Sequence, residues 1–321
     1  MPEIFDKTVE PAQKGSRLDV LLAIWFPERS RGALQNLVKQ GAVLVDGQPS
    51  KPGHKLRGRE SVRIEMPELT FIPPFMNPTP LTFPILFEDE DLIVVNKPVG
   101  LVVHPGAGHE VESVVSAVLS HCPLSPVGAP FRPGVIHRLD KPTSGVLVLA
   151  KTEWMHQKLV KAFSTRRVDK EYLALVQGAP ETERGRIDVA ITRDREQRKK
   201  MAATTHERGK SAISVFEVVE CFPGVSLVKV NILTGRTHQI RVHMAYIRTP
   251  LLGDTTYGGR IWMGREAHYL HSQRLAFTHP RTRKKMDVVA PIPEAFEEIL
   301  QDFRRRQSDA GKDARGATKG G

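Results

Sequence analysis

Residues 134–150 read Gly134-Val-Ile-His-Arg-Leu-Asp-Lys-Pro-Thr-Ser-Gly-Val-Leu-Val-Leu-Ala150. The stretch ends in an unbroken apolar run, 146–150, which predicts a short buried strand. A Pro-Thr-Ser-Gly turn opens that strand and places His137, Arg138 and Asp140 at the mouth of a sheet. Loops held by a rigid scaffold often carry functional side chains. We expect the Asp140 carboxylate to stay ionised, because neighbouring positive charge favours the charged form.

Local sequence leaves two interpretations of Asp140 open, a turn-capping residue or a catalytic carboxylate. The pattern His-Arg-x-Asp also occurs in the catalytic loop of protein kinases. However, no Gly-rich phosphate loop precedes it in this chain and no Asp-Phe-Gly follows it. We therefore exclude a kinase.

Composition points to an anionic partner. The 321 residues carry a formal net charge of +11, and the sequence shows neither a long apolar segment nor an amphipathic basic helix. This combination favours nucleic acid over membrane. The N-terminus lacks the apolar core of a secretion signal. Cys122 and Cys221 lie far apart, which is typical of free thiols in a reducing compartment. We expect a soluble, monomeric, cytoplasmic protein.

Four regions follow from the patterns along the chain. Residues 1–66 contain two helical patterns and two short strand patterns, and we expect them to form a small α/β domain. Six prolines between 67 and 84 predict an extended linker. Residues 85–303 alternate strand and helix patterns and form the second domain. The polar, basic residues 304–321 are expected to be disordered.

Basic side chains are concentrated in two places. In the first domain they are Arg29, Arg31, Lys39, Lys51, Lys55, Arg57 and Arg59. In the second they occupy a stretch poor in apolar residues, 193–210, which includes Lys199 and Lys200. Such clusters either bind RNA phosphates or form a solvated surface, and we favour RNA.

Three further motifs carry chemically useful side chains. In Asn96-Lys-Pro98, the lysine either binds phosphate or satisfies turn carbonyls, and nearby His104 is interpreted as structural. In the strand 170–176, Tyr172 is by default a core tyrosine with a satisfied hydroxyl. The segment 234–244 leads into a helix that Thr237 is expected to cap.

The chain offers no evident metal site. His238 and His243 are five residues apart, off the i, i+4 spacing of a helical metal pair, and no carboxylate or cysteine completes a site. We expect neither a metal nor a cofactor.

His-Arg-Leu-Asp-x-x-Thr-Ser-Gly at 137–145, Lys-x-Tyr at 170–172 and Gly-Arg-Thr-His-Gln-Ile-Arg-Val-His at 235–243 occur in this order. Together they resemble the RluA-type RNA pseudouridine synthases, and the first domain resembles their S4 RNA-binding module. The resemblance covers nearly the whole chain. It implies an α+β catalytic domain, with a mixed, largely antiparallel sheet and peripheral helices. The layout is most similar to members that modify large-subunit (23S) ribosomal RNA.

The resemblance also implies roles. Asp140 would be the catalytic carboxylate, Tyr172 would stack on the target uracil and act as a base, and Arg241 would pair with Asp140. Arg138 would fill the space that the flipped base leaves. The remaining candidates for RNA contact are His137, Arg236, Arg29, Arg31, Lys39, Lys199 and Lys200.

Two rival functions remain to be weighed. A non-catalytic S4-type RNA-binding protein acting in ribosome assembly would need none of Asp140, Tyr172 and Arg241. A metal-dependent RNA hydrolase would need ligands that the sequence lacks. The sequence therefore predicts an isomerase that consumes no cofactor.

Overall fold

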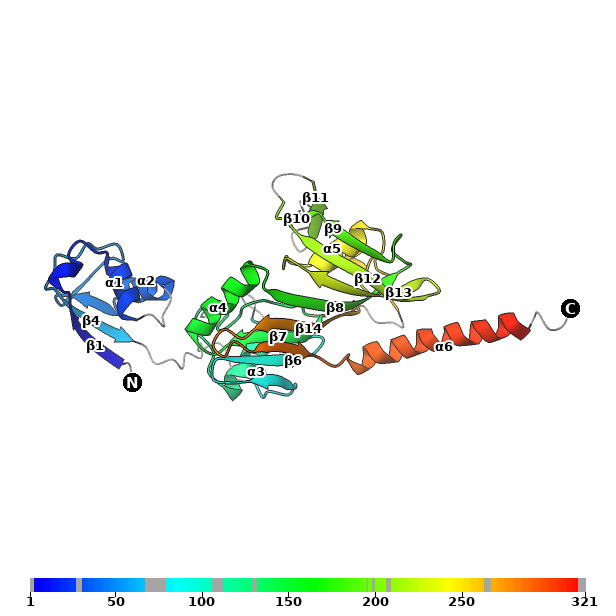
Figure 1. The fold of residues 1–321 in the computed structure, drawn as a ribbon, viewed down its shortest axis with the longest axis horizontal. Helices are drawn as coiled ribbons and strands as arrows, with labels where there is room; N and C mark the ends of the chain where they lie inside the picture. The colour runs from blue at the N-terminus through cyan, green and yellow to red at the C-terminus, as the bar shows by residue number, and fades with distance from the viewer. Residues whose placement is uncertain are drawn as a thin grey trace.

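The computed structural model describes most of the chain in two parts, each with its own hydrophobic core (Figure 1). The described residues are 3–26, 31–66, 79–105, 112–128, 132–194, 196–197, 200–205, 209–262 and 267–316. No helix in this part of the chain is long and apolar enough to cross a membrane.

The N-terminal domain packs two helices on a four-stranded sheet of order β1-β4-β2-β3. The Asp-Gly turn after β2 adopts positive φ at both residues (Asp46 50°, Gly47 75°), as the tight turn between antiparallel strands requires. A strand at the very N-terminus, β1, was not predicted. It pairs with β4, and its half-buried Phe5 packs against the core of this domain. The elements are β1 Glu3–Thr8, η1 Pro11–Gln13, α1 Leu18–Trp25, α2 Arg31–Lys39, β2 Val43–Val45, β3 Gln48–Pro49 and β4 Ser61–Met66.

The second domain is built on a nine-stranded sheet of order β5-β6-β7-β14-β8-β13-β12-β9, with β15 paired to β14. Every pairing between its described strands is antiparallel except that of β7 with β14. The predicted α+β class with a mixed, largely antiparallel sheet is confirmed. The strands are β5 Ile85–Glu88, β6 Leu92–Lys97, β7 Ser144–Ala150, β8 Val168–Gln177, β9 Arg184–Asp188, β12 Ile213–Phe222, β13 Val225–Ile232, β14 Leu270–Thr278 and β15 Lys285–Val289. A separate hairpin joins β10 Ala190–Arg193 to β11 Met201–Thr204.

Strand β7 is the predicted apolar run, and each of its residues is buried. Alternation along it divides the core: Val146 and Val148 share a cluster with Met155 and Leu159 of α4, whereas Leu147 packs with the α3 cluster. The helices of this domain are α3 Val114–His121, α4 Glu153–Ser164, α5 Gln239–Tyr246, α6 Glu294–Gly316 and the short η2 Thr255–Tyr257. Burial on both faces fixes β7, and with it the loop that carries Asp140.

Two boundaries differ from the sequence prediction. Disorder from residue 304 is wrong as far as Gly316, because α6 continues to that residue. Arg304 pairs with Glu220 of β12, and Arg306 pairs with Asp302 one turn earlier at 2.9 Å. Such pairs stabilise an exposed helix.

The proline-rich linker also requires correction at its end. Residues 67–78 lie outside the described residues. Beyond them, Phe83 is buried in the core of the second domain, Leu81 packs against the same cluster, and Pro84 accepts a hydrogen bond from the Asn96 amide. Residues 79–84 therefore belong to the second domain, because their apolar side chains are packed there.

Candidate active site

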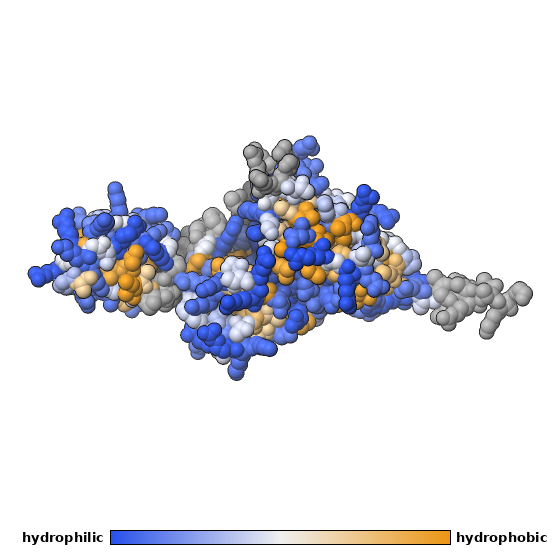
Figure 2. Space-filling model, turned by 45° about the horizontal axis from the view of Figure 1, so that its top comes forward, coloured by the Kyte–Doolittle hydropathy of each residue, from blue (hydrophilic) through white to orange (hydrophobic). Residues whose placement is uncertain are grey.

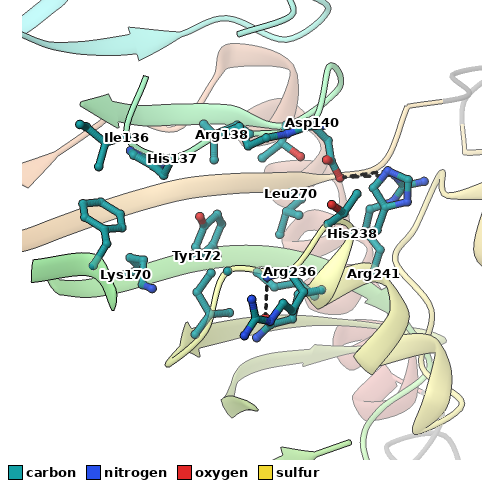
Figure 3. A pocket seen from close by; sticks show the side chains of 18 of the residues that line it. Ile136, His137, Arg138, Asp140, Lys170, Tyr172, Arg236, His238, Arg241 and Leu270 are labelled. Carbon is teal, nitrogen blue, oxygen red and sulfur yellow. Dashed lines mark hydrogen bonds and ion pairs between the residues drawn. The ribbon is translucent and has the colours of Figure 1, made fainter. Parts of the chain in front are cut away.

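Asp140 opens onto a pocket of about 380 Å³. Segments far apart in the sequence enclose it, among them the loop before β7, the end of α4, the start of β8 and the loop leading into α5 (Figure 3). The lining residues used below are Ile136, His137, Arg138, Asp140, Phe163, Lys170, Tyr172, Arg236, His238 and Arg241.

The Asp140 turn is held rigidly against the sheet. The Thr143 amide donates to the Asp140 carbonyl at 3.0 Å, and the Thr143 hydroxyl hydrogen-bonds His268 Nε2 at 2.8 Å. Gly145 has a φ of 110°, and a Cβ there would come within 2.2 Å of the Ser272 carbonyl oxygen. Only glycine lets β7 approach β14 this closely. The Asp140 side chain stays partly open to the pocket, with 17% of its surface exposed.

Arg241 reaches Asp140 from α5 while a second carboxylate holds it. Its Nε and Nη2 donate to the two oxygens of Asp254 at 2.6 and 2.8 Å, and Nη1 lies 3.4 Å from Asp140 Oδ2. The Tyr257 ring lies under the guanidinium, 4.8 Å from Cζ. A bidentate pair with buried Asp254 fixes the guanidinium plane, so the remaining nitrogen is directed toward Asp140.

His238 also faces Asp140, through a local conformation that the sequence did not predict. The expected Thr237 cap is wrong: α5 begins at Gln239, and its N-cap is His238 in the left-handed region with φ 56°. The Gln239 side chain instead accepts hydrogen bonds from Thr234 and the Arg236 amide. This brings His238 Nε2 to 3.8 Å from Asp140 Oδ2, while Nδ1 bonds the Tyr257 hydroxyl at 2.8 Å.

Tyr172 forms the floor of the pocket from β8 and is 6% exposed. Burial raises the pKa of its phenol to about 12, although a hydrogen bond with Ser272 opposes the shift. The hydroxyl is therefore protonated at neutral pH. A buried aromatic ring that lines the pocket can offer a stacking surface for a base.

The matches to known proteins agree with this geometry. A family model described as RNA pseudouridylate synthase matches residues 91–246, and an S4 domain model matches 16–62. An uncharacterized RNA pseudouridine synthase of Bacillus subtilis, YlyB, is 39% identical over 94% of this chain and 98% of its own length. The chain belongs to the RNA pseudouridylate synthase family.

Further relatives of the synthase extend the match. The ribosomal large subunit pseudouridine synthase D of Xanthomonas campestris is 37% identical over 96% of this chain and 95% of its own. Among solved structures, human RNA pseudouridylate synthase domain containing 4 superposes with a TM-score of 0.56 at 27% identity, covering 70% of this chain and 94% of that one. The synthase is thus an isomerase with an S4 domain, and the catalytic interpretation is favoured over a purely RNA-binding protein.

The structure distinguishes between the phosphate-binding and structural roles considered for Lys97 and His104. Lys97 is fully buried, and its ammonium donates to the carbonyls of Pro98, Leu101 and Lys141 at 2.8, 2.6 and 3.1 Å. Its ammonium links the turn after β6 to the turn that follows Asp140, and is therefore not available to bind phosphate. His104 Nδ1 lies 2.9 Å from the Pro105 carbonyl, which agrees with a structural role.

The expected RNA contacts of the catalytic domain lie in different surroundings. Arg138 is exposed at the pocket rim and has no hydrogen bond or ion pair to any residue that the structure describes. Arg236 is exposed and donates from Nε to the Ser211 carbonyl.

The ring of His137 stacks on Phe163, and its Nε2 accepts a hydrogen bond from the Val148 backbone amide. Burial lowers the His137 pKa to about 3, so this ring is neutral. Lys200 lies over the Tyr257 ring, 5.6 Å from its centroid.

In the S4 domain, one buried carboxylate organises basic side chains. Asp19 accepts hydrogen bonds from Arg17, Arg31 and Gln35. These hydrogen bonds, that from Arg17 above all, hold the Asp19 pKa well below its usual range. Lys39 is exposed at the end of α2. Arg29 and Lys199 lie outside the described residues.

Sequence reasoning missed Asp254, Tyr257 and Lys170 as members of the site. Asp254 and Tyr257 lie in the segment 250–259, and nothing in its local sequence distinguishes a buried Asp from a turn-forming one. Only the pairing of this segment with α5 reveals its role.

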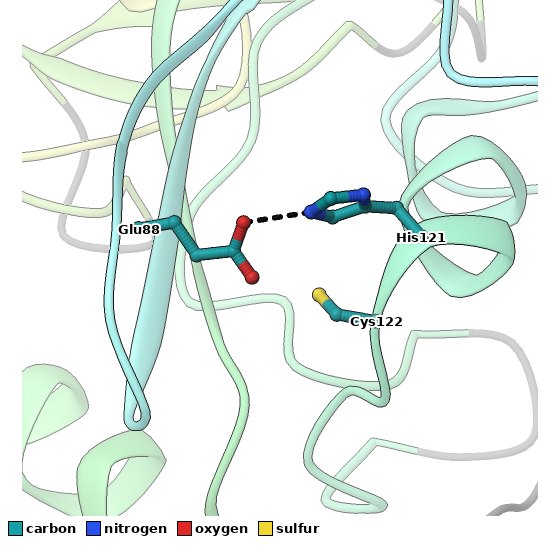
Figure 4. A group of neighbouring side chains, drawn as sticks. All are labelled: Glu88, His121 and Cys122. Carbon is teal, nitrogen blue, oxygen red and sulfur yellow. Dashed lines mark hydrogen bonds and ion pairs between the residues drawn. The ribbon is translucent and has the colours of Figure 1, made fainter.

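A separate cluster of potential metal ligands lies between β5 and α3. Glu88, His121 and Cys122 place three ligand atoms within 4.8 Å of one another (Figure 4). The Glu88 carboxylate is already paired, with Lys151 at 2.7 Å and His121 at 2.7 Å. Burial raises the pKa of the Cys122 thiol to about 11, which disfavours the thiolate that zinc binds. We interpret the cluster as a hydrogen-bonded link between β5 and α3.

Proposed function

We propose that this synthase converts uridine to pseudouridine in large-subunit ribosomal RNA, with Asp140 as the catalytic carboxylate. The observation that carries the proposal is the Asp140 carboxylate in a pocket floored by Tyr172, 3.4 Å from an arginine locked by Asp254. The ribosomal substrate rests on relatives such as the ribosomal large subunit pseudouridine synthases D of Xanthomonas campestris and Haemophilus influenzae. A ribosomal substrate places the enzyme in the cytoplasm.

The reaction requires a base that has left its stack. The uridine flips into the pocket and its ring lies on Tyr172, while Arg138 occupies the vacated space in the RNA. The N1–C1′ bond then breaks and leaves its electron pair on N1, and the freed uracil turns. A C5–C1′ bond replaces it, C5 loses its proton and N1 gains one, so the product is an isomer of the substrate. Asp140 either attacks C1′ or removes the 2′ proton. Both routes need an ionised carboxylate, and Arg241 with His238 directs it toward the pocket.

The division of the chain fits a large, structured RNA. Asp19 holds Arg17 and Arg31 beside each other on the S4 domain, where both side chains remain about half exposed (50% and 51%). Figure 2 shows hydrophilic side chains over much of the visible face of both domains.

Release of tritium from C5-labelled transcripts tests this function. We expect the full-length protein to release tritium from unmodified 23S rRNA, and to release little from 16S rRNA or tRNA of matched concentration. Equal release from all three RNAs would contradict a large-subunit target. No release from any of them would contradict the activity.

Tyr172→Phe separates stacking from proton transfer. The variant keeps the ring, so RNA affinity should stay within about twofold. We expect turnover to fall about a hundredfold, the lower range of general acid–base catalysis. The protonated phenol accepts the C5 proton only by passing its own on, and Ser272 is its hydrogen-bond partner. Single-turnover rates at saturating RNA measure the change, and an unchanged rate would leave Tyr172 as a stacking surface alone.

Removal of residues 1–66 tests the division of labour. The core of this domain contains only its own residues, and the described active-site residues all lie beyond it. We expect KM to rise, kcat to remain nearly unchanged, and log affinity to depend less steeply on log salt, because phosphate contacts set that slope. A collapse of kcat in a folded truncation would show that the S4 domain helps to build the active site.

A further inference from the structure

One buried cation in the pocket has no role in the account above. Lys170 lines the pocket from β8 and is only 6% exposed. No hydrogen bond or ion pair joins its ammonium to any residue in the described part of the chain. The ammonium lies over the Phe163 ring, 5.6 Å from its centroid. Burying an ammonium is costly unless something compensates the charge.

The position of Lys170 relative to Asp140 is informative. Lys170 and Tyr172 are two residues apart on one strand, so their side chains share a face at a spacing of about 7 Å. Figure 3 shows Lys170 and Asp140 to either side of Tyr172 along the pocket. A ribose at Asp140 with its uracil on Tyr172 therefore directs the far edge of the uracil toward Lys170.

The chemistry of the proposed reaction supplies a matching charge. Heterolysis of the N1–C1′ bond leaves the electron pair on uracil N1, and the resulting anion is delocalised over O2 and O4. Asp140 acts at the ribose and is itself an anion, so it stabilises no charge on the departing base. Arg241 is already committed to Asp254 and Asp140.

We propose that the Lys170 ammonium donates to a carbonyl oxygen of the flipped uracil and stabilises the uracil anion while it is detached from the ribose. This inference rests on the proposed function and adds a catalytic residue to it. A contact at O4 also favours uracil over cytosine, because O4 accepts a hydrogen bond whereas the cytosine amino group donates one. A donor aimed at developing charge in a water-poor pocket is typically worth a hundredfold or more in rate.

The surroundings of Lys170 leave its ammonium mostly charged at neutral pH, but the charge is lost at moderately alkaline pH. Burial, with the charge of Arg166, lowers the Lys170 pKa to about 8, and Asp169 opposes the shift. His137, on the loop packed against it, is neutral, and the Tyr172 hydroxyl is protonated. Because the cation is the active form, kcat/KM is expected to fall as the pH rises through about 8.

The test compares Lys170→Met and Lys170→Arg with Lys158→Met in the full-length protein, on unmodified 23S rRNA transcript. Lys158 is the matched control, an exposed lysine of α4 that lies over the Trp154 ring and does not line the pocket. We expect Lys170→Met to lower kcat about a hundredfold, with RNA affinity and its salt dependence unchanged. Lys170→Arg should restore most of the rate, and Lys158→Met should behave as wild type.

Three outcomes would overturn the inference. The first is unchanged kcat with weaker RNA affinity and a shallower salt dependence in Lys170→Met, which would make Lys170 a phosphate contact. The second is an equal loss in Lys170→Met and Lys170→Arg with a lowered Tm, which would make its role structural. The third is wild-type kinetics in Lys170→Met. In each case a wild-type protein that still turns over 23S rRNA leaves the proposed function intact, whereas an inactive wild type would overturn both.

The pH profile provides a readout that a structural role would not move. The decline of kcat/KM above about pH 8 should be absent from Lys170→Met and shifted to higher pH in Lys170→Arg, because a guanidinium keeps its proton there. An identical decline in all three proteins would contradict the assignment.

Discussion

Asp140→Asn should abolish turnover while RNA affinity stays nearly unchanged. Asparagine keeps the size of the side chain but removes the charge, so it can neither attack C1′ nor remove a 2′ proton. Asp140 is partly open to the pocket, and its described side-chain contacts are an ion pair with Arg241 and the ring of His238, whose pKa burial lowers. The fold should therefore tolerate the change. Tritium release from C5-labelled 23S rRNA measures turnover, and a filter-binding titration measures affinity.

The loss should exceed four orders of magnitude, because the proposed mechanism has no bypass around the carboxylate. Residual turnover within tenfold of wild type, about 1.4 kcal/mol in the barrier, would refute Asp140 as the catalytic residue. A lowered Tm with parallel loss of binding would point to a structural defect instead, so both quantities are measured on the same preparation.

Arg241→Lys should lower kcat about a hundredfold, the scale of losing one oriented donor at a reacting centre. Lysine keeps the positive charge but not the planar fork, so it cannot hold both oxygens of Asp254 and also point at Asp140. The free energy of unfolding should fall too, because Asp254 is 1% exposed and a broken buried pair typically costs about 3–5 kcal/mol.

Arg274→Lys is the matched control. Arg274 makes the same two-bond contact with Asp287, at 2.6 and 2.8 Å, but on a partly exposed stretch of β14 outside the pocket. We expect nearly unchanged kcat and a small stability change for this variant, since exposed pairs contribute little. Equal losses of kcat in the two variants would show that the effect at Arg241 is not specific to the Asp140 site.

The sequence was most informative where one segment determines its own structure. The apolar run 146–150 can be satisfied only by a strand buried on both faces, and it is one. The turn that precedes this strand is therefore fixed at one end of it, which places Asp140 at the edge of the sheet. The Asp-Gly turn after β2 was predictable for the same local reason.

The remaining features depend on contacts between distant segments. Strand β14 lies between β7 and β8 in the sheet, although it begins more than a hundred residues after the start of either strand in the sequence. Asp254 meets Arg241, and Lys97 meets the Lys141 carbonyl, only in the assembled domain. The composition of residues 304–316 alone is that of a solvated tail. The pair between Arg304 and Glu220, which supports the extension of α6, forms only in the folded domain.

The account is tested most directly by mapping pseudouridine in 23S rRNA from cells that lack this protein. Wild-type protein and Asp140→Asn, expressed at equal levels, are each returned to those cells. We expect specific 23S positions to lose pseudouridine in the absence of the protein, wild type to restore them, and Asp140→Asn to leave them as uridine. Restoration by Asp140→Asn, or a 23S pattern that does not change when the protein is removed, would contradict the central claim.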